Sequence, residues 1–303
     1  MTKLGLVPYP SGDGPAARSV PVSVVVLAKN EAANLGHCLD SVAWAEQVVV
    51  VDSGSTDETP TIASSRGAEV VHEPWRGFAR QRQFALEMDV LRHSWIYFVD
   101  ADEWVTSDGA REVAAAITHA EHAAYRQRFR LVFQGRWIRH CGWYSGAWII
   151  RLMRRDQAAY GAGGTFGERP TIAGSIGTLT NDLVDQDRKG LAAWLHKHVD
   201  YAVLEAERRG VDLGLRERLQ RWPAMRRTDT RPMARAVLKD LVFPAVPAKP
   251  LAIFVYMYIV RLGFLDGVVG LRFCVFHAWF QVTVNAVRNS PHRQASSEPG
   301  PTT

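Results

Sequence analysis

The chain has 303 residues, of which 47% are hydrophobic and 22% are charged, as in a globular protein with one large domain or two smaller ones. Its three cysteines, Cys38, Cys141 and Cys274, are far apart and form no Cys-x-x-Cys pair. Neither a disulfide framework nor a zinc site is therefore indicated, and a reducing compartment is expected. The net charge of +5 is uneven, because Lys and Arg exceed Asp and Glu by seven from Glu205 onward while the remaining residues have a net charge of −2. Basic tails of this kind meet nucleic acid or anionic lipid.

Strand-like and helix-like patterns alternate in the first third of the chain. Residues 1–20 lack the apolar stretch of a secretory signal and are interpreted as a flexible leader. The predicted elements that follow are a strand at Val22–Leu27, a helix at Glu31–Trp44, a strand at Gln47–Val51, a short helix ending at Ala63, a strand at Glu69–Val71, a helix at Phe78–Val90 and a strand at Trp95–Val99. Strict alternation indicates βαβ units and a mostly parallel α/β sheet, in which ligands bind outside the carboxyl ends of the strands.

The pattern changes after Asp108. The predicted elements are a helix at Ala110–His119, strands at Ala124–Phe133 and Trp137–Leu152, a Gly-rich loop at Gly161–Gly167 and a long amphipathic helix at Leu191–Arg209. A strongly basic segment, Arg216–Arg235, comes next. These features predict a second half of different construction from the alternating first half.

The C-terminal part is apolar and aromatic. Leu251–Val260 contains ten apolar residues, and the apolar character continues to Val287 with interruptions at Arg261, Asp266 and Arg272. No uninterrupted run reaches the roughly 20 residues that a spanning helix needs. The segment is either a buried helical hairpin or a surface that lies in a bilayer interface, and the basic segment upstream favours the interface.

Polar clusters follow the predicted strands, and the densest is Asp100-Ala101-Asp102-Glu103. Carboxylates this close repel one another, and a divalent cation such as Mg²⁺ or Mn²⁺ would relieve the repulsion. Asp102 could hold such an ion against a diphosphate. Asp52 could bind a nucleobase or ribose or could close an Asx turn, and Arg82 could reach phosphates or lie solvated on its helix. The chain has no P-loop and no dinucleotide-binding glycine motif after the first strand.

Several ordered motifs resemble the family 2 inverting glycosyltransferases, which have a GT-A fold. The motifs are Val22–Glu31, Val51–Thr59, Phe78–Leu86 and Val99–Glu103, and the resemblance extends over roughly Val22 to Val287. Gly135–Tyr144 and Arg261–Gly267 are similar to the lipopolysaccharide-core β-glucosyltransferase subgroup. The expected organisation is a leader (1–20), a catalytic domain (21–210) with a nucleotide-sugar half (21–108) and an acceptor half (109–210), a basic and apolar helical region (211–290) and a disordered tail (291–303).

The resemblance implies roles for individual residues. The nucleotide sugar would be bound by Ala28, Asn30, Glu31, Asp52, Arg82, Asp100 and Ala101, and the metal by Asp102. Glu168 would be the general base, although Gly167 replaces the His that often precedes this Glu in the subgroup. Asp182 and Asp185 are alternative bases. Trp143 and Tyr144 could stack on an acceptor sugar or pack in the core.

The expected activity is metal-dependent transfer of a hexose, glucose by resemblance, from a UDP-sugar to a lipid-linked or lipopolysaccharide-core acceptor. An anionic membrane surface is an expected partner and nucleic acid is not, with the enzyme at the cytoplasmic side of the inner membrane. Two alternatives stay open. A sugar-nucleotidyltransferase shares this sheet type but needs a Gly-rich phosphate loop where Lys29-Asn30-Glu31 stands. A non-catalytic basic module that binds membrane or RNA is the other.

Overall fold

The computed structural model describes residues 20–146, 148–161, 169–209 and 248–290. The chain divides into two compact units. The first comprises Met1–Arg139 with Trp143–Leu191, and the second comprises His140–Gly142 with Ala192–Thr303. The predicted tail, most of the leader and all of the basic segment lie outside the described residues.

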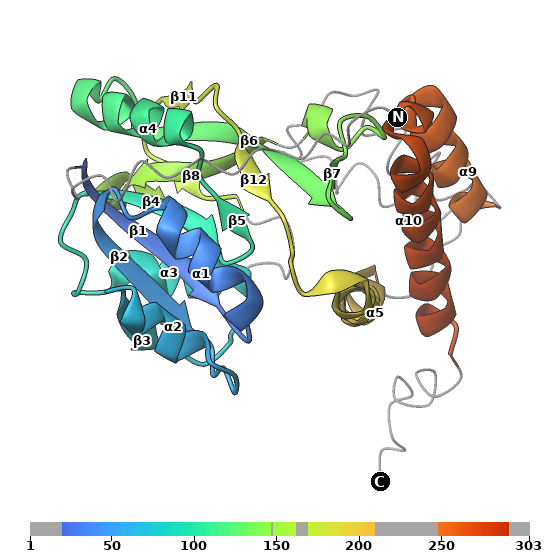
Figure 1. Ribbon diagram of the computed structural model, residues 1–303, viewed down its shortest axis with the longest axis horizontal. Coiled ribbons are helices and arrows are strands. Elements are labelled where there is room, and N and C mark those ends of the chain that lie inside the picture. The colour runs from blue at the N-terminus through green and yellow to red at the C-terminus, as the bar shows by residue number, and fades with distance from the viewer. Residues whose placement is uncertain (1–19, 147, 162–168, 210–247, 291–303) are drawn as a thin grey trace, which may run out of the picture. The chain divides into compact units, whose positions relative to one another are not determined.

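The first unit contains a mixed sheet flanked by helices (Figure 1). Its strands are β1 (Val20–Ala28), β2 (Ala45–Asp52), β3 (Glu69–His72), β4 (Trp95–Asp100), β5 (Glu103–Trp104), β6 (Ala124–Phe133), β7 (Arg136–Trp137), β8 (Trp148–Arg154), β9 (Ala158–Ala159), β10 (Thr171–Ile172), β11 (Ile176–Thr178) and β12 (Leu183–Asp185). Its helices are α1 (Ala32–Ser41), α2 (Thr59–Ser65), α3 (Phe78–Glu87) and α4 (Ser107–His119), with 3₁₀ turns at Tyr144–Gly146 and Arg155–Gln157.

The main sheet has the strand order β3-β2-β1-β4-β8-β6-β12-β5. Strands β3, β2, β1 and β4 are parallel, as the alternation of strands and helices predicts. β8 is antiparallel to both β4 and β6, so β6 runs in the same direction as β4. The carboxyl ends of β1, β2 and β4 therefore lie at one edge of the sheet, where the polar clusters begin.

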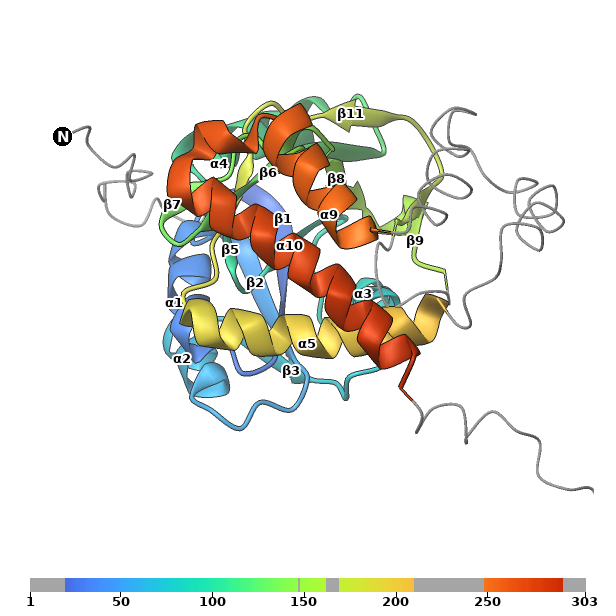
Figure 2. The same cartoon turned by 90° about the vertical axis from the view of Figure 1, so that its right-hand side faces the viewer.

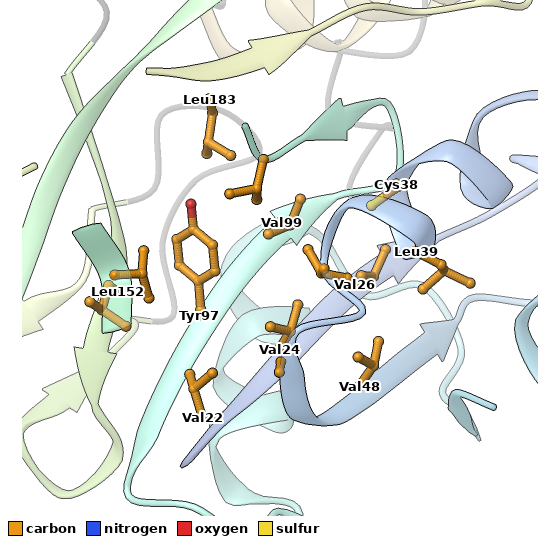
Figure 3. Packing of buried hydrophobic residues seen from close by; sticks show 14 of the residues in the cluster. Val22, Val24, Val26, Cys38, Leu39, Val48, Tyr97, Val99, Leu152 and Leu183 are labelled. Carbon is orange, nitrogen blue, oxygen red and sulfur yellow. The ribbon is translucent and has the colours of Figure 1, made fainter. Parts of the chain in front are cut away.

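Both faces of the central strands are buried, which explains their continuous apolar runs. Val22, Val24 and Val26 of β1 pack on one face with residues of α1, α2 and α4, together with Tyr97 and Leu152 (Figure 3). Val25 points to the other face, where α3 covers Phe98 of β4. Thr106 begins α4, because its side chain accepts a hydrogen bond from the backbone N–H of Gly109.

The single strand predicted at Trp137–Leu152 is wrong. The structure has β7, a 3₁₀ turn and β8 in this stretch. Cys141 and Gly142 have positive φ angles of 60° and 79°, which a continuing strand does not allow. Predicted helix ends are also too long, since α1 stops at Ser41 and α3 at Glu87.

The second unit is helical. It contains most of α5 (Gly190–Arg209), α9 (Lys249–Val255), a π-helical turn at Tyr256–Val260, a 3₁₀ turn at Gly263–Asp266 and α10 (Gly267–Arg288). Figure 2 shows α10 crossing α5, and the contact is made by Ala202 and Ala206 against Val284. Asp266 connects His140–Gly142 to the helices of this unit, since its carboxylate accepts a hydrogen bond from the backbone N–H of His140 at 2.8 Å.

By length and composition alone, this unit contains one helix among the described residues that could cross a membrane, despite the charged residues that interrupt its sequence. Gly263–Arg288 is helical over 26 residues, and an 18-residue window in it has a mean hydropathy of 1.3, enough for a membrane-crossing helix. Only 22% of that window is buried. Arg272 does not interrupt the helix because a single long side chain can direct its charge along the helix surface.

Candidate active site

The loops after β1 and β2 hold one another in place. The backbone N–H of Asn30 donates to Ser55 Oγ at 2.8 Å, and the N–H of Thr56 returns a bond to Asn30 Oδ1 at the same distance. Glu31 N donates to Thr59 Oγ1 at 2.8 Å. Asn30 has a φ of 55°, a conformation that asparagine tolerates better than most residues. The two loops that are predicted to bind the donor are thus connected to each other by hydrogen bonds within the protein.

Asp52 closes a turn at the end of β2. Its buried carboxylate accepts from the backbone N–H groups of Gly54 at 3.2 Å and Ser55 at 3.1 Å, and His72 Nδ1 lies 3.2 Å from the same carboxylate. This is the Asx-turn role that the sequence left open. Its predicted role in nucleoside binding stays a prediction.

Asp100, at the end of β4, is held by two guanidinium groups. Arg82 of α3 donates to Asp100 Oδ1 at 2.8 Å, and Arg151 of β8 donates to Oδ2 at 2.6 Å. Burial alone would raise the pKa of Asp100, but the charges of Arg151 and Arg82 outweigh burial and hold the pKa well below its usual range. Asp100 therefore stays ionised, and Arg82 is buried against it instead of lying solvated on its helix.

Glu103 is the buried partner of Arg151. Its side chain is 4% exposed, and its two oxygens lie 2.7 Å from Arg151 Nη2 and 2.8 Å from the backbone N of Asp100. Burial raises the pKa of Glu103 to about 7, with Arg151 opposing the shift and Asp100 adding to it. Glu103 belongs to β5 as well as to this ion-pair network.

A register shift directs Arg151 toward the acids. Tyr125 pairs with Leu152 but Arg126 pairs with Ile150, so Arg151 is an extra residue in β8. Such a bulge turns a side chain out of the regular alternation. Arg151 is a residue of this site that is not among the predicted ones, although a single arginine inside the apolar run from Trp148 to Met153 is a usable signal.

Glu31 and Asp102 form the second acidic part of the site. Burial and then the charge of Asp102 raise the pKa of Glu31, against the lowering effects of Lys189 and Asn34. Lys189 Nζ lies 2.6 Å from Glu31 Oε1, and Asn34 Nδ2 donates to Glu31 Oε2 at 2.7 Å. The backbone O of Asp102 accepts from Gln186 at 2.9 Å, so the segment before α5 lies over these acids. Sequence patterns did not predict this long-range approach of Lys189.

The described residues suit a metal that is shared with a substrate. Their His, Cys, Asp and Glu side chains include no group of three that could hold an ion. Mg²⁺, however, is commonly held by one or two carboxylates together with substrate phosphates. The mutual repulsion of Glu31 and Asp102 is the feature that a cation at Asp102 would relieve, whereas Asp100 is already neutralised by arginine.

The other predicted residues lie in different surroundings. Ala28 and Ala101 are buried, and Ala28 O accepts from Ser53 N at 2.9 Å. Trp143 is 39% exposed, and Tyr144 Oη donates to Asp182 Oδ2 at 2.8 Å. Asp185 pairs with Glu103 in the sheet. Gly167 and Glu168 lie outside the described residues, so the general base stays a prediction.

The family profile described as Glycosyl transferase family 2 matches residues 23–174, half of the chain. The fold and the acidic sheet edge thus belong to a sugar-transferring enzyme domain of the GT-A type, as predicted. The chain is a member of glycosyltransferase family 2.

Individual proteins are similar over shorter stretches. The lipopolysaccharide core biosynthesis glycosyltransferase LpsC of Rhizobium meliloti is 40% identical over 89 residues, which are 28% of this chain and 32% of the relative. The uncharacterized glycosyltransferase RP128 of Rickettsia prowazekii is 32% identical over 118 residues, which are 38% and 40% of the two chains. The chain therefore matches less than half the length of either relative. The solved structure of glucosyl-3-phosphoglycerate synthase from Mycobacterium tuberculosis with Mn²⁺, UDP and glucosyl-3-phosphoglycerate is 17% identical, with a TM-score of 0.41. The superposed part is 58% of this chain and 74% of the synthase chain.

Proposed function

We propose that the protein is a metal-dependent inverting glycosyltransferase that moves a hexose from a UDP-sugar to a lipid-linked or lipopolysaccharide-core acceptor. The observation that carries the proposal is the placement of Glu31 and Asp102 beside the arginine-bound Asp100, at the carboxyl edge of a family 2 domain. Ligands of open α/β sheets bind at this edge. The name of LpsC supports the acceptor class.

Donor binding would use two groups of residues at the carboxyl edge of the sheet, one for the nucleoside and one for the metal. The joined loops at Asn30 and Asp52 would receive the nucleoside, with Asp100 held ionised by Arg82 and Arg151 to accept its hydrogen bonds. Asp102 would hold Mg²⁺ or Mn²⁺. When bound, the ion would neutralise charge on the departing diphosphate. Lys189, which lies against Glu31, is close enough to this edge to add a positive charge.

The proposed general base is Glu168, which would deprotonate the acceptor hydroxyl that attacks the anomeric carbon with inversion. Asp182 is the weaker candidate, because Arg130 and Tyr144 already occupy its carboxylate. We expect Glu168→Gln to keep UDP binding and to lose transfer by about 10²–10⁴-fold, the usual contribution of general-base catalysis. Isothermal titration with UDP and a transfer assay on the same preparation measure the two effects. Full transfer by the variant would assign the base elsewhere.

The second unit is the proposed membrane-associating region. Among its described residues, the exposed large apolar side chains are Val199, Val203, Leu251, Val255, Tyr256, Ile259, Val260, Leu262, Phe264, Leu265, Val268, Leu271, Val275 and Val282. Apolar surface on this scale is unusual for a soluble monomer. We propose that it contacts the cytoplasmic side of the inner membrane, with the basic segment Arg216–Arg235 attracted to anionic lipid.

The membrane proposal predicts that the full chain co-sediments with vesicles containing phosphatidylglycerol more strongly than with phosphatidylcholine vesicles. The difference should shrink as salt rises from 0.05 to 0.5 M, values chosen to shorten the Debye length from over ~10 Å to under ~5 Å. Equal sedimentation with both vesicle types would remove the electrostatic part of the proposal. Sedimentation with neither would remove the proposal as a whole.

The transferase proposal itself is tested by thermal unfolding with nucleotides. UDP with Mn²⁺ should raise the unfolding midpoint, because a ligand that binds only the folded state stabilises it. UDP with EDTA should give a smaller rise, and GDP with Mn²⁺ serves as the comparison for base preference. A screen of UDP-sugars for metal-dependent hydrolysis then identifies the donor. Absence of any nucleotide effect would favour the non-catalytic binding module.

A further inference from the structure

β6 carries three arginines at alternate positions, Arg126, Arg128 and Arg130, called here the arginine ladder. Because side chains alternate along a strand, the three lie on one face. Each guanidinium lies against an aromatic ring: Arg126 and Arg128 are 4.8 and 4.9 Å from the ring centre of Trp148, Arg128 is 4.7 Å from that of Tyr144, and Arg130 is 5.1 Å from that of Trp137. The strand thus presents a surface of guanidinium groups alternating with rings.

The ladder carries more positive charge than its described partners neutralise. Among described residues, Asp182 is the carboxylate that meets it, with Oδ2 2.9 Å from Arg130 Nε and Oδ1 3.9 Å from Arg128 Nε. Arg126 Nε donates to the hydroxyl of Thr178 at 3.2 Å. The side chains of Arg128 and Arg130 are 34% and 32% exposed, and Arg126 is exposed. The arginines are therefore fixed in position yet accessible.

The ladder extends toward the active edge. β6 runs in the same direction as β4, with β8 between them (Figure 1). Its later residues, Arg128 and Arg130, consequently approach the edge at which Asp100 and Asp102 lie. The donor-site arginines, Arg82 and Arg151, bind Asp100 and leave the ladder as a separate positive surface.

We propose that the arginine ladder binds the acceptor, and that the acceptor is a saccharide bearing an anionic group, either phosphate or carboxylate. Guanidinium groups bind both anions through paired hydrogen bonds, and flanking rings offer flat apolar faces to a sugar. Cations fixed by rings and by Asp182 favour a defined anionic group over a diffuse lipid surface. The inference rests on the proposed glycosyltransferase function and adds the substrate class to it.

The test compares Arg126→Gln/Arg128→Gln with Arg111→Gln, a control on the exposed surface of α4. Titration of the full chain with a phosphorylated saccharide, its dephosphorylated form, a uronic acid and the matching neutral sugar measures binding without turnover. We expect the double variant to bind the preferred anionic saccharide about 10- to 100-fold more weakly, a loss of about 1.4–2.8 kcal/mol, since glutamine replaces charged hydrogen bonds by weaker neutral ones. The control should bind as the wild type does. Preference for the phosphate or the carboxylate form identifies the anion.

Steady-state transfer separates the alternatives. The proposal requires a higher KM for the anionic acceptor at unchanged KM for the UDP-sugar. A rise confined to the donor KM would assign the ladder to the diphosphate, and a loss confined to vesicle binding would assign it to the membrane; either result overturns the proposal. Equal wild-type binding of charged and neutral saccharides also overturns it. Anionic-saccharide binding by a wild type that transfers no sugar would instead defeat the transferase proposal and leave the ladder's assignment standing. Arg126→Gln alone, at an exposed position, provides the same comparison if the double variant does not fold.

Discussion

Replacing Arg151 by methionine is expected to lower the free energy of unfolding of the first unit by about 3–5 kcal/mol, the usual effect of removing one partner from a buried ion pair. Arg151 is 6% exposed and donates to both Asp100 and Glu103. Without it, two carboxylates would face each other with Arg82 as the remaining described cation. Protonation of Glu103, whose pKa is already raised, would limit the loss. Chemical denaturation of the full chain, followed by the fluorescence of its tryptophans, measures the change.

Arg154→Met is the matched control for this prediction. Arg154 lies three residues along the same strand, and its partner Asp156 has a side chain that is 65% exposed. Surface pairs contribute about 0–1 kcal/mol, so a small change is expected. Adding Glu103→Gln to Arg151→Met should restore part of the lost stability, because it removes one of the two uncompensated charges. An Arg151→Met protein as stable as the Arg154→Met protein would contradict the role assigned to the network.

Asp102→Asn is expected to reduce sugar transfer by at least about 100-fold, since a metal that stabilises developing charge contributes several kcal/mol to the barrier. The substitution retains the backbone oxygen of Asp102, which accepts from Gln186 in the segment before α5. The pKa of Glu31 should fall once the charge of Asp102 is gone. Transfer measured against Mn²⁺ concentration should therefore show both a lower maximum and a weaker metal dependence.

Asp108→Asn, on the exposed first turn of α4, is the control for Asp102→Asn. Its side chain pairs with Arg111 at the surface and should leave the metal titration unchanged. Turnover and metal dependence of Asp102→Asn that both equal those of the wild type would remove the metal role. A stabilising effect of UDP with Mn²⁺ that persists in the inactive variant would place the residue in catalysis instead of metal binding.

Local sequence patterns predict the part of the candidate site that lies at the carboxyl ends of the parallel strands. Val22–Leu27 and Trp95–Val99 are apolar because their strands are buried on both faces, and parallel strands end at the same edge. The polar residues at or just after the strand ends, such as Asn30 and Asp100, therefore lie at the same edge of the sheet. Arg82 pairs with Asp100, and the binding roles expected of both residues stay predictions.

The rest of the site depends on contacts between residues far apart in sequence. Arg151 meets Asp100 across a register shift that no period-2 pattern contains. Lys189 meets Glu31 over 158 positions, which requires knowing where the chain turns after β12. The interruption between β7 and β8 at Cys141 and Gly142 likewise depends on positive φ angles. Aromatic residues on either side of it have a high strand propensity, so the sequence predicts a continuous strand there. Secondary-structure propensity depends on residues that are neighbours in the sequence, whereas these features depend on tertiary contacts.

The mutual bonding of the loops after β1 and β2 has a thermodynamic consequence. Asn30, Ser55, Thr56 and Thr59 already make their contacts in the protein alone, so little backbone freedom is left to lose when a ligand arrives. Ordering a loop on binding subtracts from affinity, and a preformed loop avoids that loss. Nucleotide association should accordingly be a single fast phase whose rate rises linearly with concentration, without the saturating phase that a slow rearrangement of this edge would add.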